Sequence, residues 1–89
     1  MSGATPDEAL AAQIADIICG AFDLDPQLVE AEARLVEDLG LDSIDAVDLS
    51  VRTRPLTGRK MTDEELREVR TVGDVVALVA RMRAERGAP

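Results

Sequence analysis

Apolar side chains recur every three or four residues near both ends of the chain, which is the spacing of one face of an α-helix. Near the N-terminus the stripe consists of Leu10, Ile14, Ile17 and Ile18. Near the C-terminus it consists of Val72, Val75, Val76, Val79 and Met82. Each stripe predicts a long helix with one buried face.

Capping signals indicate where the first helix begins and ends. Thr5 is followed by Pro6, which suits the first helical position, and by Glu8 three residues on, as in a capping box. Gly20 predicts the end of the helix, because glycine is favoured just past a helix C-terminus. Cys19 lies beside the apolar stripe and is expected to be a half-buried packing residue.

Two further capping patterns lie in the C-terminal half of the chain. Thr62 with Glu65 predicts a short third helix that extends to Val69. Thr71 with Asp74 predicts the start of the last helix, and Gly87 its end. Basic residues suit the last turns of a helix, and here they are Arg81, Arg83 and Arg86.

A second helix is predicted to begin at Ser43 and to have two apolar faces. One stripe consists of Ile44, Val47 and Val51, and the other of Ala46 and Leu49. Since one face can enter the core, we expect the other, led by Ile44, to remain free for a partner. Pro55 predicts an early end to this helix, because it lacks an N–H group and disfavours the helical conformation at Arg54. Residues 56–60 are then expected to form a loop.

Residues 22–40 show no clean hydrophobic period, and Asp25 and Pro26 interrupt them. We expect a long, ordered loop with one turn of helix, anchored in the core by apolar side chains. The candidate anchors are Leu24, Leu28, Val29, Leu35 and Leu39. The whole chain is predicted to be all-α, a four-helix bundle with a long loop between helices 1 and 2 and a short helix 3, in a single domain over residues 1–89.

The composition narrows the possible functions. The core has to be aliphatic, because Phe22 is the only aromatic residue among 89. The absence of histidine removes the commonest general base and metal ligand and weighs against an enzyme. A single cysteine, Cys19, allows neither an intramolecular disulfide nor a Cys/His zinc site. The cysteine count therefore favours a reduced protein with no bound metal. Because the chain has neither an apolar run of membrane length nor a signal peptide, we expect it to be cytoplasmic. We also expect a monomer.

Charge is distributed unevenly around the net value of -8. Residues 1–50 contain twelve acidic residues against the single base Arg34, whereas residues 51–89 contain six acidic and nine basic residues. An acidic front of this kind repels nucleic acid and anionic membranes. It steers the protein instead towards partners with basic patches.

The candidate chemistry lies at Ser43, in the segment Leu-Gly-Leu-Asp-Ser-Ile of residues 39–44. A serine at the first helical position is exposed, and a phosphate attached to it would meet unpaired backbone N–H groups. No histidine, neighbouring lysine or Gly-x-Ser-x-Gly turn is present to activate the hydroxyl, so we expect another enzyme to modify it. Alternatively, the Asp-Ser pair serves only as a helix cap, and the chain is an unmodified helical adaptor that binds other proteins.

Residues 35–49, Leu-Val-Glu-Asp-Leu-Gly-Leu-Asp-Ser-Ile-Asp-Ala-Val-Asp-Leu, resemble the prosthetic-group attachment segment of acyl carrier proteins, whose hallmark is Gly-x-Asp-Ser-[Leu/Ile] followed by an acidic helix. The resemblance implies a four-helix bundle that is a carrier and not an enzyme. It implies that a phosphopantetheinyl transferase attaches 4'-phosphopantetheine from coenzyme A to Ser43, and that acyl groups are held on this arm as thioesters.

By the same resemblance, the partners are a ketosynthase, an acyl transferase or ligase, and other pathway enzymes with basic docking patches. The partner-recognition face would consist of Asp42, Ile44, Asp45, Val47 and Asp48. Peptidyl or aryl carriers of peptide-synthetase-like systems are an alternative with the same attachment chemistry. Peptidyl carriers usually have Gly-Gly-x-Ser, however, and Asp42 does not fit that motif.

Residues 50–55 depart from the family pattern, because Arg52 and Arg54 stand where relatives usually have acidic residues. We therefore expect the second half of the docking face to be basic and unwound, and Ser50 and Thr53 to make an acyl pocket narrower or more polar. These departures favour a dedicated fatty-acid or polyketide pathway over ordinary fatty-acid synthesis. Residues 51–60 and 70–76 look more like carriers of specialised pathways, such as those of aryl polyenes, than like the carrier of ordinary fatty-acid synthesis.

Overall fold

The apolar stripes form helices that pack on one another in the computed structural model, which describes residues 6–87. The elements are α1 (Pro6–Phe22), the 3-10 helix η1 (Pro26–Leu28), α2 (Ser43–Thr57), α3 (Asp63–Glu68) and α4 (Val72–Gly87). The predicted all-α fold, with a long loop between α1 and α2 and a short α3, is therefore confirmed. Within residues 6–87, no helix is long and apolar enough to cross a membrane.

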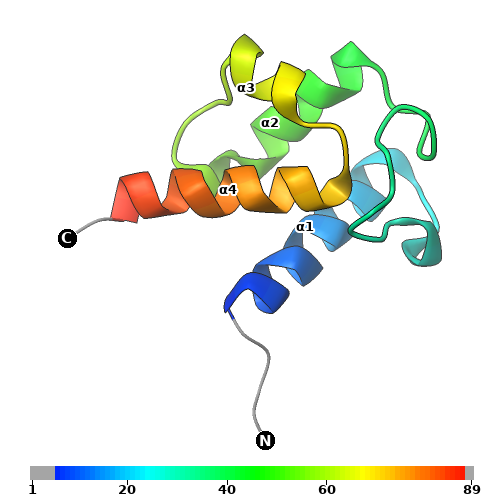
Figure 1. Cartoon of the computed structure of the whole chain (residues 1–89), viewed down its shortest axis with the longest axis horizontal. Helices are drawn as coiled ribbons and strands as arrows, with labels where there is room; N and C mark the ends of the chain where they lie inside the picture. Colours follow the sequence, from blue (N-terminus) through cyan, green and yellow to red (C-terminus); the bar gives the residue numbers. More distant parts are fainter. Residues whose placement is uncertain (1–5, 88–89) are drawn as a thin grey trace, which may run out of the picture.

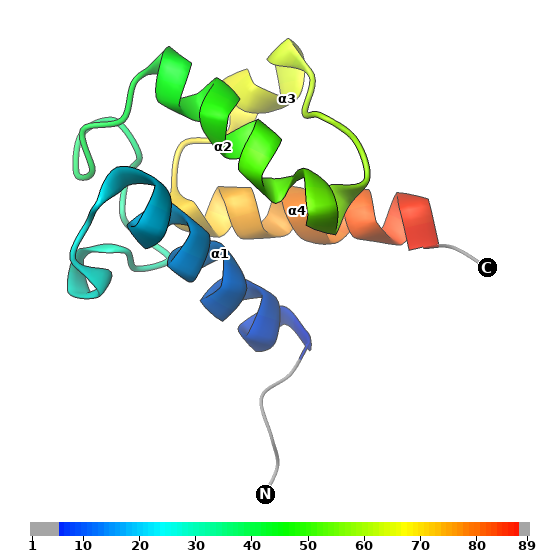
Figure 2. The same ribbon diagram turned by 180° about the vertical axis from the view of Figure 1, so that it is seen from behind.

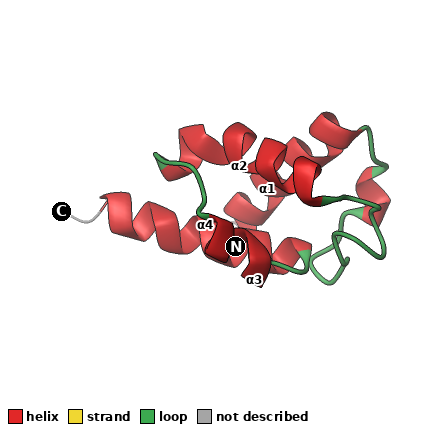
Figure 3. Ribbon diagram, turned by 90° about the horizontal axis from the view of Figure 1, so that it is seen from above, coloured by secondary structure: helices red, strands yellow, loops and turns green. Residues whose placement is uncertain are grey.

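Helices α1, α2 and α4 contact one another pairwise and enclose the core. Figure 1 shows α1 crossing behind α4, and Figure 2, seen from behind, shows α1 and α2 both lying in front of α4. The core is aliphatic as expected, and its most deeply buried members are Ile14, Ile18, Val75, Val79 and Met82. The long loop lies at one end of the bundle, opposite the C-terminal end of α4, as the view from above shows (Figure 3).

Helix α1 ends two residues later than predicted. Gly20 lies inside the helix, which continues to Phe22. Asp23 takes the left-handed conformation instead, with φ 53°, and the Leu24 N–H donates to the Cys19 carbonyl at 3.1 Å. This bond closes a Schellman motif, and Leu24 packs partly against the core. Pro6 is the first residue of α1, whereas the predicted cap Thr5 lies outside the described residues.

The side chain of Cys19 is half-buried, as expected for a packing residue. Burial raises the pKa of its thiol above the usual value, and the nearby carboxylate of Asp16 adds to the shift. Cys19 is therefore held in its neutral, unreactive form.

The predicted early end of α2 at Pro55 is wrong, and so is the expectation that this half of the helix is unwound. Pro55 lies inside α2, which continues to Thr57 and ends at Gly58 with φ 83°. Pro55 is exposed, so its ring faces solvent, whereas Thr53 and Thr57 are buried on the opposite side. Burial of these two residues holds the last turn against the bundle and overrides the local preference against a proline.

One arginine in the α2–α3 connection, Arg59, forms ion pairs with both α3 and α4. The two guanidinium nitrogens Nη1 and Nη2 of Arg59 donate to the two carboxylate oxygens of Glu65, each at 2.9 Å, and Nη2 also lies 3.3 Å from the carboxylate of Glu85 on α4. Glu65 in addition accepts from the Thr62 N–H at 2.8 Å, and the Thr62 hydroxyl accepts from the Glu65 N–H. The predicted capping box is thus confirmed, and Arg59 ties α3 to α4.

The Glu65 carboxylate gives this clamp a defined pH dependence. Hydrogen bonds from Arg59 lower the pKa of Glu65 from 4.5 to about 2. A lowered folded-state pKa stabilises the fold above the unfolded-state pKa, and this contribution is lost as the pH falls from about 4.5 towards 2. We expect Glu65→Gln to lower the urea midpoint of unfolding at pH 7 and to have little effect near pH 2. Glu64→Gln, one residue away on the exposed side, is the control, and an equal effect of both changes at pH 7 would contradict the clamp.

Candidate functional site

The loop that precedes α2 is anchored by its apolar side chains. The buried anchors are Val29, Ala33, Leu35, Leu39 and Leu41. Three of them were predicted, whereas the expected anchor Leu28 is exposed in η1 and Leu24 is half-buried. Because the anchors alternate with exposed residues, the loop lies across the end of the bundle with one side in the core.

Backbone hydrogen bonds tie the same loop to the beginning of α4. The Leu35 N–H donates to the Arg70 carbonyl at 2.9 Å, and the Val72 N–H donates to the Ala33 carbonyl at 3.0 Å. The Gly73 N–H donates to the Ala31 carbonyl at 2.8 Å. The loop therefore accepts from two N–H groups at the start of α4 that have no partner within the helix.

Inside the loop, Arg34 and Asp38 close a tight turn. The Asp38 carboxylate accepts from the Arg34 backbone N–H at 2.8 Å and from its guanidinium at 3.2 Å. Hydrogen bonding to Arg34 lowers the pKa of Asp38, so the carboxylate stays ionised. Gly40 follows with φ 70°, a conformation that glycine adopts without strain, and turns the chain into α2.

Ser43 occupies the first position of α2, as predicted, and is exposed. Asp42 is the N-cap: its carboxylate accepts from the Asp45 N–H at 2.9 Å, and the Asp45 carboxylate accepts from the Asp42 N–H at 3.1 Å. The N–H groups of Ser43 and Ile44 have no acceptor within the described residues, and the Ser43 hydroxyl makes no hydrogen bond there. The helix start thus presents a free hydroxyl beside two free amide donors.

The acidic residues of the predicted partner face have other contacts in the structure. Asp42 and Asp45 form the capping box just described, and the Asp48 carboxylate pairs with Arg52 at 3.2 Å. The spacing Asp-x-x-Asp across residues 42–45 was the signal for this capping box, which the sequence analysis missed. The apolar members of the face are free: Ile44 is 77% exposed and Val47 52%.

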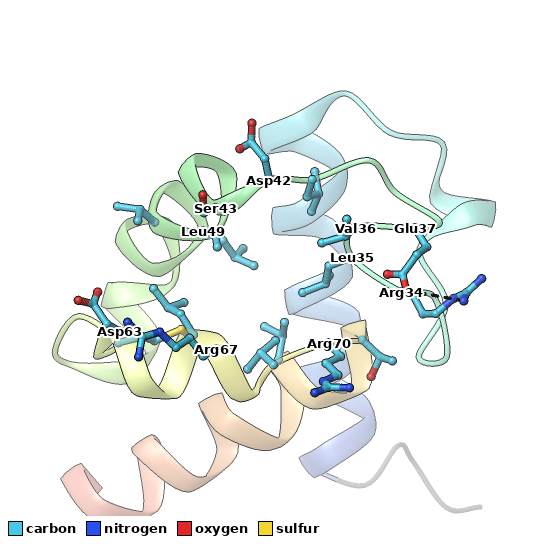
Figure 4. A pocket seen from close by; sticks show the side chains of 18 residues that line it. Arg34, Leu35, Val36, Glu37, Asp42, Ser43, Leu49, Asp63, Arg67 and Arg70 are labelled. Atoms are coloured by element: carbon cyan, nitrogen blue, oxygen red, sulfur yellow. Dashed lines mark ion pairs between the residues drawn. The ribbon is translucent and has the colours of Figure 1, made fainter.

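A pocket of about 900 Å³ opens beside Ser43, between α2, α3 and the long loop. Figure 4 shows Leu49 and Leu35 on its opposite walls, with Ser43 and Asp42 at its upper edge. Its apolar lining consists of Leu35, Val36, Leu41, Ala46, Val47, Leu49, Met61, Leu66, Val69 and Val75. Three arginines and three acidic residues also line it: Arg34, Arg67, Arg70, Glu37, Asp42 and Asp63. The pocket is thus a largely aliphatic space that ends at the exposed serine.

The expectation that Ser50 and Thr53 make this pocket narrower or more polar is wrong. Neither residue lines the pocket. The Ser50 hydroxyl accepts from the Met61 N–H at 2.8 Å, and the Thr53 hydroxyl donates to the Leu49 carbonyl at 2.9 Å. Both hydroxyls are therefore satisfied inside the bundle, where the Ser50 contact joins α2 to the α2–α3 connection.

Comparison with known proteins identifies the family. Residues 12–79 match the family described as the phosphopantetheine attachment site. The chain is 51% identical over 63 residues to acyl carrier protein 2 of Ralstonia nicotianae, covering 71% of this chain and 78% of that protein. It is 38% identical over 82 residues to the meromycolate extension acyl carrier protein of Mycolicibacterium smegmatis, covering 92% of this chain and 83% of the relative.

The fold gives the same result. A solved structure of the acyl carrier protein from Enterococcus faecalis matches with a TM-score of 0.68 and 25% identity, covering 86% of this chain and 98% of that one. The chain therefore belongs to the phosphopantetheine-attachment family of acyl carrier proteins. Proteins of this family are carriers and not enzymes; their prosthetic group is 4'-phosphopantetheine, and they interact with the enzymes of a pathway.

The capping role of Asp42 predicts a measurable cost of its removal. Asp42→Ala removes the side-chain acceptor for the Asp45 N–H and should lower the free energy of unfolding by about 1 kcal/mol. Asp42→Asn keeps an oxygen acceptor, so its cost should be only a few tenths of that value. Urea denaturation followed by circular dichroism measures both variants. Equal destabilisation by alanine and asparagine would show that the charge of Asp42, and not the cap, stabilises the helix.

Proposed function

We propose that Ser43 is the attachment point of the 4'-phosphopantetheine arm and that the chain is an acyl carrier for a fatty-acid-type pathway. The observation that carries the proposal is the free hydroxyl of Ser43 at the start of α2, next to the unpaired N–H groups of Ser43 and Ile44. These donors and the helix dipole favour a phosphodiester at this position. Once attached, the arm supplies a terminal thiol that holds acyl groups as thioesters.

The pocket supports an aliphatic cargo. The apolar part of its walls consists of leucine, valine, methionine and alanine side chains, which stabilise an apolar chain by removing it from water. Hydrocarbon chains suit this lining better than the oxygen-rich intermediates of polyketide synthesis. The name of the Mycolicibacterium relative refers to extension of meromycolate, and a long-chain substrate of that kind agrees with the lining proposed for this chain. An aryl-polyene-type pathway remains the specialised variant that the sequence resembles.

The partners follow from this role. We expect a phosphopantetheinyl transferase, a ketosynthase, and an acyl transferase or ligase to approach α2 with basic patches around Ser43, because residues 1–50 carry most of the negative charge. We expect this work to take place in the cytoplasm, where coenzyme A, the donor of the arm, is available.

Loading of the arm is tested by intact-mass spectrometry after incubation with coenzyme A and a broad-specificity phosphopantetheinyl transferase. The wild-type chain should gain the mass of one phosphopantetheinyl group, and Ser43→Ala should gain none. Ser50→Ala is the matched control: Ser50 is buried, so this variant should still be loaded if circular dichroism shows it folded. If the wild-type chain stays unmodified while a known carrier is loaded in the same tube, the chain is an unmodified adaptor.

The pocket is tested by comparing octanoyl-loaded with acetyl-loaded protein by NMR. The longer chain should shift the methyl signals of Met61, Leu66 and Val69, which line the pocket. Ala46→Phe fills part of the space and should remove most of this difference, whereas Ala84→Phe on the exposed side of α4 should leave it unchanged. If the octanoyl and acetyl forms give the same methyl spectra in the wild-type chain, the cargo does not enter this pocket.

A further inference from the structure

The outward face of α2 carries a stripe of apolar side chains that are about half exposed or more. Ile44 is 77% exposed, Val47 52% and Val51 48%. Their spacing of three and four residues places them in one row along the helix. Pro55 follows at the end of the row and is also exposed. A continuous apolar row on the surface of a small protein indicates a contact surface.

The charges beside this row change sign along the helix. At the Ser43 end stand the carboxylates of Asp42 and Asp45. In the middle, the Arg52 Nε lies 3.2 Å from the Asp48 carboxylate, so the two opposite charges largely cancel. Towards the C-terminal end stands Arg54, which is exposed and makes no ion pair with the described side chains of residues 8–85. The face is therefore acidic near the serine and basic at its far end.

Arg54 lies on the same side of the row as Ser43. Arg54 lies eleven positions after Ser43, which is about three helical turns, or about 16 Å along the axis. Because α2 continues unbroken through Pro55 to Thr57, Ser43 and Arg54 lie on one rigid helix and this distance between them is fixed. A partner that reaches Ser43 and covers the apolar row must therefore also cover Arg54.

We propose that α2 is a two-signed docking face, and that Arg54 selects partner enzymes bearing a carboxylate at the far end of their docking surface. The apolar row provides the contact area, and a basic group on the partner faces Asp42 and Asp45. Opposite Arg54, a lysine or arginine would be repelled, whereas a carboxylate would be paired. Arg54 thus excludes enzymes whose docking surface is basic throughout. The proposal rests on the proposed function, because it assumes partners that approach Ser43.

The experiment uses a bacterial ketosynthase whose carrier-docking surface is lined with lysine and arginine throughout. The full-length chain is used as Ser43→Ala, so that binding reports docking alone and does not depend on loading of the arm. Calorimetry or fluorescence titration at low salt measures the dissociation constant for this chain and for the same chain with Arg54→Gln, Arg54→Glu or Arg83→Glu. Arg83→Glu changes the net charge by the same amount on the exposed side of α4, and circular dichroism verifies the fold of each variant.

Arg54→Glu should bind this ketosynthase about three- to tenfold more tightly than the chain with arginine, and Arg54→Gln should lie between them. High salt should reduce the difference, since it screens exposed charges. Arg83→Glu should have little effect. A ketosynthase variant with glutamates at the far end of its docking surface should reverse the order and favour Arg54.

Two results would overturn the proposal. Equal tightening by Arg54→Glu and Arg83→Glu would mean that only net charge matters. No tightening by Arg54→Glu would mean that Arg54 lies outside the contact. Because every chain in this titration lacks the Ser43 hydroxyl, these results are independent of whether Ser43 takes the arm, which the mass measurement decides separately.

Discussion

Three backbone hydrogen bonds between the long loop and the first residues of α4 are the constraint on which the site depends. They join Leu35 to Arg70, Ala33 to Val72 and Ala31 to Gly73. Both partners need them: α4 obtains acceptors for N–H groups that its own first turn leaves unpaired, and the loop obtains a fixed path across the end of the bundle. The approach at Gly73 is close, because a Cβ atom there would lie 3.0 Å from the Ala31 carbonyl oxygen. Without this fixed path, neither the start of α2 nor the loop wall of the pocket would have a defined position.

The sequence predicted best what depends on neighbouring residues. Capping boxes at Thr62 and Thr71 need partners only three residues away, and both form where expected. The end of α1 was misplaced because the left-handed residue is Asp23 and not Gly20, and Leu24 behind it packs against the core. The end of α2 was misplaced because burial of Thr53 and Thr57 keeps the turn that contains Pro55 helical. The pocket was beyond prediction in detail, since its walls come from three separate stretches of chain. The motif around Ser43 could be recognised, but the pairing of Asp48 with Arg52 required a continuous helix that the sequence argued against.

Beside the ordinary buried Leu49, helix α2 places hydroxyl residues in the core and aliphatic residues at the surface. Its inner face buries the hydroxyl residues Ser50, Thr53 and Thr57, and its outer face exposes three aliphatic side chains. Each buried hydroxyl has a backbone partner, so the inner face is satisfied, although it contributes less hydrophobic stabilisation than leucines would. The exposed part of this row, most of all Ile44, gains no hydrophobic stabilisation in the isolated chain. The apolar area on this face contributes to stability only when a partner covers it, which is the pattern expected of a functional surface.

The acidic residues near Ser43 act at two distances. At short range, Asp42 and Asp45 begin the helix, and Asp48 is occupied by Arg52, so none of the three is a carboxylate without an intramolecular contact. At long range their charges still add to the negative field of residues 1–50, which attracts basic surfaces irrespective of detailed geometry. Attraction of this kind speeds the encounter but discriminates poorly between basic partners. Discrimination between basic partners therefore requires a group of the opposite charge within the contact surface. On α2 the exposed guanidinium of Arg54 is such a group.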